Sequence, residues 1–206
     1  SDLALEVSSQ YPKKTVVFFG DSITDGISKT DDTRNNYPDI FSAKLHNKIK
    51  TSEIAVINKG INGDRLTEKG LKRYAHDVLN IKGVKYIVVL YGVNDLNILN
   101  KTSSEIISGY KTIIELAHKR NIFIYSGTIL PFSEYKCEYL WNTNKEKVRN
   151  EVNEWIRNTA PDKGGFDAVF DYDKEMKDPN VKTKLAKIYN CGDGLHPNLT
   201  GYQKMV

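Results

Sequence analysis

The sequence predicts a three-layer α/β/α fold built on a parallel sheet. Runs that resemble strands alternate with runs that resemble helices along the whole chain, which is the order of a βα repeat. The strand-like runs are apolar at nearly every position, as is typical of parallel strands that are buried on both faces. Five such repeats predict a five-stranded parallel sheet with helices on both sides, that is, a flavodoxin-like architecture.

The first half of the chain supplies three of the expected strands. Residues 14–20 (KTVVFFG) are β-branched and aromatic up to a final glycine and predict the first strand. Residues 37–50 carry apolar side chains at helical spacing and predict a helix. Residues 53–58 (EIAVIN) predict the second strand and 68–80 the next helix. The run 85–92 (KYIVVLYG) predicts a third strand that is buried on both faces.

The second half of the chain continues the alternation. Residues 103–120 predict a long helix, and residues 121–130 (NIFIYSGTIL) predict the fourth strand. Residues 144–158 predict an amphipathic helix, which precedes the fifth strand at 166–172 (FDAVFDY). Residues 197–206 predict a last helix with a proline near its first turn, where proline is favoured.

Length and composition limit the classes of protein to which the chain can belong. Its 206 residues predict a single domain over 1–206, and a chain that does not begin with Met can be a piece of a longer protein. The 30 basic and 26 acidic residues are mixed along the chain, so the net charge of +4 does not indicate a nucleic-acid partner. No apolar run approaches the roughly 18 residues that a membrane span needs. The sequence leaves the oligomeric state open.

The two cysteines, Cys137 and Cys191, lie far apart in the sequence. Their spacing matches neither a zinc site nor a CxxC redox motif, and we expect no metal site. Two interpretations stay open. The cysteines are either separate thiols or a disulfide between two loops that follow strands.

Polar residues and glycines follow the expected strands at the points where they end. Ser22 follows the first strand, Gly63 lies in a glycine-rich loop after the second, and Asn94 follows the third. Near the end of the chain, DGLHP sets Asp193 three residues before His196. Because the carboxyl ends of parallel strands meet at one edge of a sheet, we expect these residues to lie together.

These residue types suit nucleophilic catalysis. A serine hydroxyl becomes a good nucleophile when an imidazole removes its proton, and an imidazole titrates near neutrality. His196 is therefore the expected base for Ser22, and Asp193 can fix the tautomer of the imidazole. The backbone N–H groups of Ser22 and Gly63 and the side-chain amide of Asn94 are the expected donors to an oxyanion.

Three further residues beside these motifs are expected to be structural. Asp21 precedes the serine and can accept hydrogen bonds from N–H groups of the turn. Gly60 is expected to meet a backbone requirement of the loop after the second strand. Asp95 is expected to brace the loop that carries the neighbouring asparagine.

At these motifs the sequence resembles the SGNH (GDSL) hydrolases. GDSI, the glycine of NKGINGD, GVND and DGLHP are similar to the four blocks of that family, over nearly the whole chain from 15 to 202. The resemblance implies a flavodoxin-like sheet and ester hydrolysis that needs no metal or cofactor. It places Ser22, Gly63, Asn94, Asp193 and His196 at the family's site positions. An isoleucine stands where the older spelling of the first motif has leucine.

Within the family, GDSITDG, INGDRL, GTILPF and GLHPNLTGY look most like a bacterial branch associated with plant-polysaccharide degradation. That branch resembles esterases that remove acetyl groups from xylan and related glycans. The resemblance implies a serine esterase for short acyl groups, O-acetyl above all, on an acylated carbohydrate. The alternative is a lipid or thioester acylhydrolase of the same fold, of arylesterase, lysophospholipase or thioesterase type. A secreted or cell-surface location fits a polysaccharide substrate, and a cytoplasmic one stays open.

Long segments after strands are expected to wall the site. They are 131–142, which is rich in aromatic residues, and 178–195. Four side chains near the expected site are candidates for substrate contact. Arg65 is either such a contact or a surface charge. Tyr37, Tyr91 and Trp141 are either rings that stack on a sugar or packing residues.

A distant alternative is a non-catalytic, flavodoxin-like module that binds a nucleotide or flavin at the same edge. Such a module would need a phosphate cradle, yet neither GxGxxG nor GxxxxGK[ST] occurs in the sequence. It also leaves the ordered set of serine, asparagine, aspartate and histidine without a role.

Overall fold

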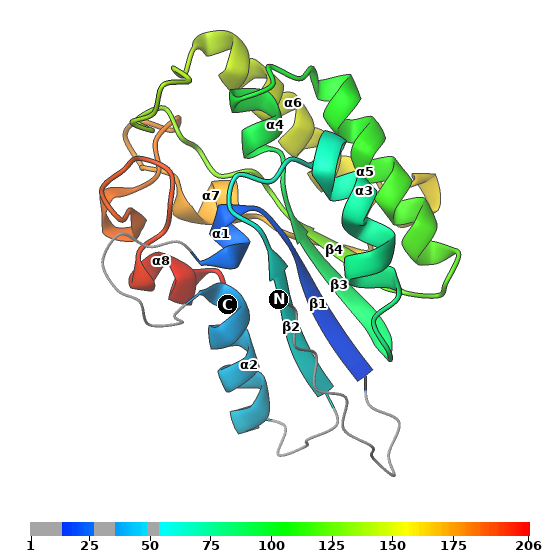
Figure 1. The fold of residues 1–206 in the computed structure, drawn as a ribbon. Coiled ribbons are helices and arrows are strands. Elements are labelled where there is room, and N and C mark those ends of the chain that lie inside the picture. The colour runs from blue at the N-terminus through cyan, green and yellow to red at the C-terminus, as the bar shows by residue number, and fades with distance from the viewer. Residues whose placement is uncertain (1–13, 27–35, 49–53) are drawn as a thin grey trace.

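The computed structural model describes residues 14–26, 36–48 and 54–206. Figure 1 shows a twisted sheet flanked by helices, as the sequence predicted. Residues 49–50 and 53, at the ends of two expected elements, lie outside the described residues. None of the described helices is long and apolar enough to cross a bilayer.

The described part of the chain contains one parallel sheet with five strands, which confirms the predicted fold class. The strands are β1 (Lys14–Gly20), β2 (Ile54–Gly60), β3 (Val84–Leu90), β4 (Phe123–Gly127) and β5 (Ala168–Phe170). Their order across the sheet is β2-β1-β3-β4-β5, and every pair is parallel. The chain therefore changes direction across the sheet between β1 and β3. This change is the position at which open α/β sheets bind ligands.

The helices mostly follow the predicted positions. They are α1 (Ser22–Asp25), α2 (Tyr37–Lys48), α3 (Leu71–Tyr74), α4 (Val93–Asn97), α5 (Ser103–His118), α6 (Thr143–Asn158), α7 (Tyr172–Met176) and α8 (Leu199–Lys204). Wide π-helical turns at Leu66–Gly70 and Ala75–Leu79 flank α3, and single 3₁₀ turns occur at Pro161–Lys163 and Lys187–Tyr189. The short helices α1, α4 and α7 were not predicted, because four or five residues are too few to show a helical period.

Polar residues mark the starts of several helices. Asp21, Thr102, Asn142, Asp171 and Asn198 each accept a hydrogen bond from a backbone N–H of the first turn that follows. These side chains satisfy N–H groups that have no partner inside a helix, which is why such residues are favoured there. The local sequence therefore fixes where α1, α5, α6, α7 and α8 begin.

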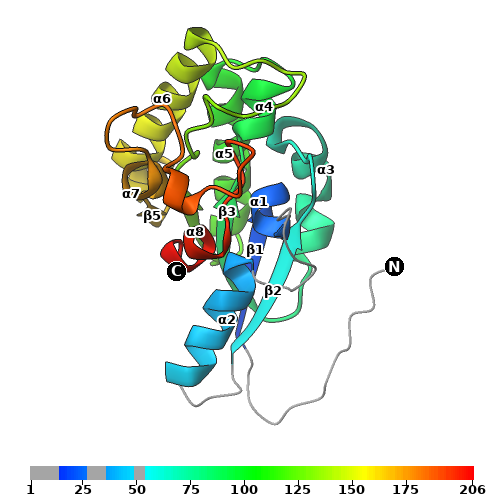
Figure 2. The ribbon, with the colours of Figure 1, turned by 90° about the vertical axis from the view of Figure 1, so that its left-hand side faces the viewer.

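The helices form two layers. Helices α3, α5 and α6 pack together on one face of the sheet, whereas α2 and α8 lie on the other face (Figures 1 and 2). Alternate residues of the central strands point to opposite faces of the sheet. Val17, Phe19 and Ile87 on one face are fully buried, and Phe18 and Val88 on the other are 3% and 4% exposed, so these strands are covered on both sides. This double burial explains why the strands are continuously apolar in sequence.

Two long segments beyond the strands pack against each other at the carboxyl edge. The N–H of Ser133 donates to the carbonyl of Thr183 at 3.0 Å, and the N–H of Lys136 donates to the carbonyl of Asp193 at 2.9 Å. The segment 131–142 therefore lies beside the segment 178–195, whose last part carries Asp193 and leads to His196.

Candidate active site

Ser22 stands just beyond the carboxyl end of the inner strand β1, as the first residue of α1. Asp21 caps this one-turn helix, and Gly26 ends it with a left-handed φ of 101°. The serine is buried to 4% exposure, and its Oγ lies 2.8 Å from Nε2 of His196. The tight turn thus aims the hydroxyl at the imidazole.

Asp193 holds the opposite side of the imidazole. Its Oδ2 lies 2.6 Å from Nδ1 of His196, and its Oδ1 accepts the N–H groups of Leu195 and His196 at 2.9 Å each. Burial alone would raise the pKa of Asp193. The hydrogen bonds from the imidazole and the two N–H groups outweigh burial and hold this pKa well below its ordinary value. The carboxylate is therefore ionised and orients the ring.

The geometry also assigns the imidazole tautomer. An ionised Asp193 accepts only, so Nδ1 of His196 carries the proton that bridges them. Nε2 is then left as an acceptor for the hydroxyl of Ser22. This direction of hydrogen bonding is the one in which the imidazole can remove a proton from the serine.

The loop after β2 forms a tight turn around Gly63. The N–H of Asp64 donates to the carbonyl of Ile61 at 3.1 Å, and Gly63 has a left-handed φ of 69°. A methyl group added to Gly63 would meet no atom within 4 Å, so its backbone lies open. The N–H groups of Gly63 and Ser22 donate to no acceptor among the described residues.

Asn94 reaches the same loop from the other side. It lies in α4, beyond the end of β3, and is 7% exposed. Its Nδ2 donates to the carbonyl of Asp64 at 3.1 Å, which fixes the amide. One N–H of that amide is engaged in this bond, and the other is available to a substrate.

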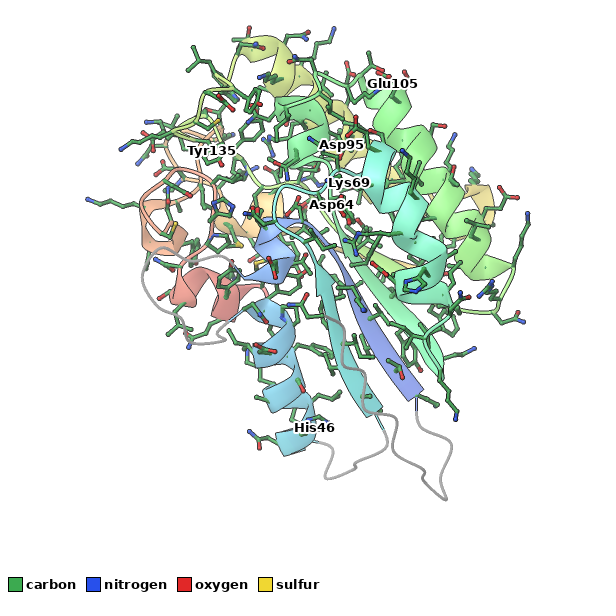
Figure 3. All side chains as sticks on the ribbon, viewed as in Figure 1. His46, Asp64, Lys69, Asp95, Glu105 and Tyr135 are labelled. Carbon is green, nitrogen blue, oxygen red and sulfur yellow. The ribbon has the colours of Figure 1, made fainter. Side chains whose placement is uncertain are left out.

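Asp95 was expected to brace the loop that carries Asn94, but it instead holds the chain that follows the glycine loop after β2. Its carboxylate accepts the N–H groups of Leu66 and Thr67 and the hydroxyl of Thr67, at 2.7–2.9 Å. Burial raises the pKa of Asp95, although these hydrogen bonds oppose the shift. Figure 3 shows Asp64 and Asp95 near each other beyond the strand ends.

Asp21 is buried beside the nucleophile. Its Oδ1 accepts the N–H of Ile23 at 3.0 Å, whereas its Oδ2 has no hydrogen-bond partner among the described residues. Burial raises its pKa to about 7, against the opposing effects of that N–H and of His196. The structural role expected for Asp21 is thus confirmed, with an electrostatic consequence that the sequence did not indicate.

Gly60 is confirmed as a backbone requirement. A side chain at this last residue of β2 would place its Cβ 2.1 Å from the backbone nitrogen of Asp25. Helix α1 therefore packs directly on the end of β2, and only glycine allows this approach.

Two of the candidate substrate contacts need correction. Tyr37 and Tyr91 are each only 1% exposed, and their hydroxyls bond to Thr24 and to Asp64 respectively. Neither ring has a face free for a sugar, so both belong to the fold. Packing tyrosines and stacking tyrosines look alike in sequence, which is why the pattern could not separate them.

The other two candidates lie nearer the surface. Arg65 is partly exposed, and its Nε lies 3.0 Å from Oε2 of Glu68. Trp141 is partly buried against the core, and its indole N–H has no acceptor among the described residues. Both stay candidates for substrate contact.

Further aromatic residues of the segment 131–142 lie close to the Asp/His pair. The ring of Tyr135 packs edge-on against His196, with centroids 5.9 Å apart (Figure 3 labels Tyr135). Tyr139 is 39% exposed, and its hydrogen bond with Glu138 raises its pKa, whereas the charge of Arg65 acts weakly in the opposite direction. Leu140 beside it is 75% exposed.

Arg73 is the residue at this edge that sequence analysis missed. It lies in α3 and donates to Asp64, Asp77 and Tyr91 and to two backbone carbonyls. Its helix also carries the exposed Lys72, and a partly buried arginine beside that lysine has no distinguishing mark in sequence. Only the three-dimensional contacts reveal it.

The two cysteines do not form a disulfide in this structure. The described residues contain no group of three or more His, Cys, Asp or Glu side chains that could hold a metal ion.

Comparisons with known proteins agree with the fold and the motifs. The model of the GDSL-like Lipase/Acylhydrolase family matches residues 18–204. No curated protein matches the chain. Among solved structures, the chain resembles a GDSL-like lipase from Bacteroides thetaiotaomicron, with 24% identity, a TM-score of 0.70, and 93% of this chain and 83% of that chain covered.

Two further structures show the same fold. A lipase/acylhydrolase from Enterococcus faecalis has 24% identity and a TM-score of 0.70, with 92% of this chain and 90% of that one covered. A member of the lipolytic protein G-D-S-L family from Veillonella parvula has 20% identity and a TM-score of 0.68, with 93% of each chain covered.

Proposed function

The chain belongs to the GDSL-like lipase/acylhydrolase family, and we propose that it is a serine esterase for short acyl groups on hydroxylated carbohydrates. O-acetyl groups on a plant polysaccharide such as xylan are the substrates we expect. The observation that carries the proposed chemistry is the hydrogen-bonded series from Ser22 through His196 to Asp193, with links of 2.8 and 2.6 Å.

Acylation begins with attack of Ser22 Oγ on the ester carbonyl. As the new C–O bond forms, the hydroxyl proton moves to Nε2 of His196, and Asp193 stabilises the resulting imidazolium. The carbonyl oxygen becomes an oxyanion, and the proposed donors to it are the N–H groups of Ser22 and Gly63 and the amide of Asn94. None of these donors has to move far, because the surrounding hydrogen bonds already fix their loops.

Collapse of the tetrahedral intermediate breaks the bond to the leaving alcohol. His196 gives its proton to the departing oxygen of the sugar, and the acyl group remains on Ser22. Water then attacks the acyl-enzyme with the same base and the same oxyanion donors. The acid is released, and the serine recovers its proton from the imidazole.

The carbohydrate assignment is supported by the segment 131–142. This wall beside His196 presents aromatic and polar side chains, including the ring of Tyr135 and the exposed ring of Tyr139. Aromatic faces suit the flat apolar faces of sugar rings. A long acyl chain would instead need an extended apolar groove.

The test is the release of acetate from acetylated xylan and of p-nitrophenol from its acetate, octanoate and palmitate esters, for the wild type and Ser22→Ala. Acetate release and a steep fall in rate with chain length, both lost in the variant, support the proposal. Faster octanoate turnover would instead indicate the lipid-type acylhydrolase. Equal inertness of both proteins on every ester would contradict an esterase of any kind.

A further inference from the structure

Arg73 connects parts of the chain that surround the proposed oxyanion donors. Its side chain is 13% exposed. The guanidinium donates to the carbonyl of Gly20 at 3.2 Å, to the carbonyl of Lys59 at 2.9 Å and to Oδ2 of Asp64 at 2.7 Å. These acceptors lie at the last residue of β1, near the end of β2, and in the loop that follows β2.

Tyr91 extends this connection to the third strand. Its hydroxyl accepts a hydrogen bond from Arg73 at 2.5 Å and donates one to Oδ2 of Asp64 at 2.6 Å. The guanidinium also lies over the ring of Phe19, 4.4 Å from its centroid. One planar group therefore ties together the carboxyl ends of β1, β2 and β3.

Each proposed oxyanion donor lies next to one of these contacts. Ser22 comes two residues after Gly20, and Gly63 directly precedes Asp64. The amide of Asn94 is itself held by the backbone carbonyl of Asp64 at 3.1 Å. The guanidinium thus contacts the chain within two residues of both N–H donors, and it fixes the residue that orients the third.

We propose that Arg73 is a positioning residue that sets the relative placement of the three oxyanion donors. This inference rests on the esterase function proposed above. The positive charge of Arg73 is matched by the carboxylates of Asp64 and Asp77, at 2.7 and 3.0 Å. Its contribution is therefore geometric, through preorganised donors, rather than a direct attraction for the oxyanion.

Arginine suits this role because its donors form a rigid planar fork. A lysine would keep the charge but offers its donors from a single point, so it cannot reach the separated acceptors at once. The first variant is therefore Arg73→Lys, which retains a cation beside Asp64. We expect kcat on p-nitrophenyl acetate to fall by about 10- to 100-fold with KM changed by less than about threefold.

Arg149→Lys is the matched control. Arg149 lies in α6, is 1% exposed, and donates to the carbonyl of Ile129 and to the carboxylates of Glu146 in α6 and Asp173 in α7. Its replacement removes a comparable buried network, none of whose hydrogen bonds involves an oxyanion donor or Asp64. At a temperature where both variants are folded by circular dichroism, Arg149→Lys is expected to keep kcat within about twofold of the wild type.

A double-mutant cycle distinguishes positioning from general stabilisation. If Arg73 acts through the donors, its substitution costs less once a donor is already missing, because coupled residues are not additive. In an Asn94→Ala background, the effect of Arg73→Lys on kcat is expected to shrink at least about threefold.

Tyr91→Phe is the replacement variant if Arg73→Lys fails to fold. It removes the tyrosine hydroxyl from the hydrogen-bond network of Arg73 without adding a charge. We expect that variant to lower kcat by about three- to tenfold.

The outcomes separate this inference from the proposed function. An active wild type in which Arg73→Lys, or Tyr91→Phe in its place, leaves kcat at the level of Arg149→Lys would overturn the positioning role and leave the esterase assignment standing. Full additivity with Asn94→Ala would overturn it as well. A wild type that hydrolyses no ester would overturn both together.

Discussion

His196 Nε2 lies 2.8 Å from Ser22 Oγ, although 174 positions separate the two residues in the chain. The serine stands at the end of the first strand, and the histidine lies in the loop before the last helix. Their contact therefore requires the complete fold. Because Asp193 holds the other nitrogen of the ring at 2.6 Å, the same contact also sets the direction of proton transfer.

Asp193→Asn tests that direction. The amide oxygen can still accept the N–H groups of Leu195 and His196, so the loop is expected to keep its shape. The amide nitrogen would then face Nδ1 as a donor and favour the tautomer with its proton on Nε2, which cannot accept from Ser22. We expect kcat to fall by about three to four orders of magnitude. A variant that retains a tenth or more of the wild-type rate would contradict this assignment of the proton.

Glycine is favoured at positions 60 and 63 for two different structural reasons. Alanine at Gly60 would clash with the backbone of Asp25 at 2.1 Å and displace the helix that carries Ser22. Alanine at Gly63 meets nothing within 4 Å, and only its φ of 69° is unfavourable. The expected cost at Gly63 is about 1–2 kcal/mol, and its N–H is retained.

Thermal unfolding and p-nitrophenyl acetate hydrolysis of the two variants check this difference. Gly63→Ala is expected to stay folded with kcat within about tenfold of the wild type, because the donor remains. Gly60→Ala is expected to lose more stability and most of its activity. The reverse order of stabilities would show that the packing of α1 on β2 is not the constraint we describe.

The main features of the fold and site could be predicted from the sequence because they depend on local pattern. Strands buried on both faces are continuously apolar, so β1 and β3 were recognisable. The residues at their ends then followed from the geometry of a parallel sheet. The four motifs also occur in a set order along the chain, which is why Ser22, Asn94, Asp193 and His196 could be placed at one edge of the sheet.

What could not be predicted depends on contacts between distant segments. The acceptors of Arg73 lie at positions 20, 59, 64, 77 and 91, and no local pattern shows that one helical arginine reaches them. Tyr37 and Tyr91 were open between stacking and packing for the same reason. The π-helical turns around α3 are likewise invisible, because their residues are those of an ordinary amphipathic helix.

Asp21 gives a prediction for the pH dependence of stability. Burial raises its pKa from 3.8 to about 7, so between these values the folded protein keeps a proton that the unfolded chain has lost. The folded state then binds more protons, and the contribution of Asp21 to stability falls as pH rises through this window. The expected slope is at most about 1.4 kcal/mol per pH unit. Below pH 3.8 the contribution is fully present.

Urea unfolding of the wild type and Asp21→Asn at about pH 4, 5.5 and 8 measures this contribution. Asparagine keeps the acceptor for Ile23 and cannot ionise, so its stability relative to the wild type is expected to increase from the lowest pH to the highest. The lowered pKa of Asp193 acts in the opposite sense, by loss of stability as pH falls, and is common to both proteins. A difference that is constant with pH would show that Asp21 titrates alike in the folded and unfolded states.

The segment 131–142 gives a prediction that separates a carbohydrate esterase from a general one. Tyr139 and Leu140 are neighbours on this segment with exposed side chains, and only the tyrosine offers an aromatic face. If sugar rings stack there, Tyr139→Ala weakens the binding of a glycan but not of a small aryl ester. A stacking contact of this kind corresponds to about a two- to tenfold change. We therefore expect kcat/KM on acetylated xylo-oligosaccharides to fall by about that factor in Tyr139→Ala, with the rate on p-nitrophenyl acetate kept.

Leu140→Ala is the control, because it removes a comparable exposed apolar side chain; it is expected to change neither rate. Equal losses in both variants would mean that the wall contributes only apolar area, which fits an acyl chain better than a sugar and would shift the proposed substrate to a lipid.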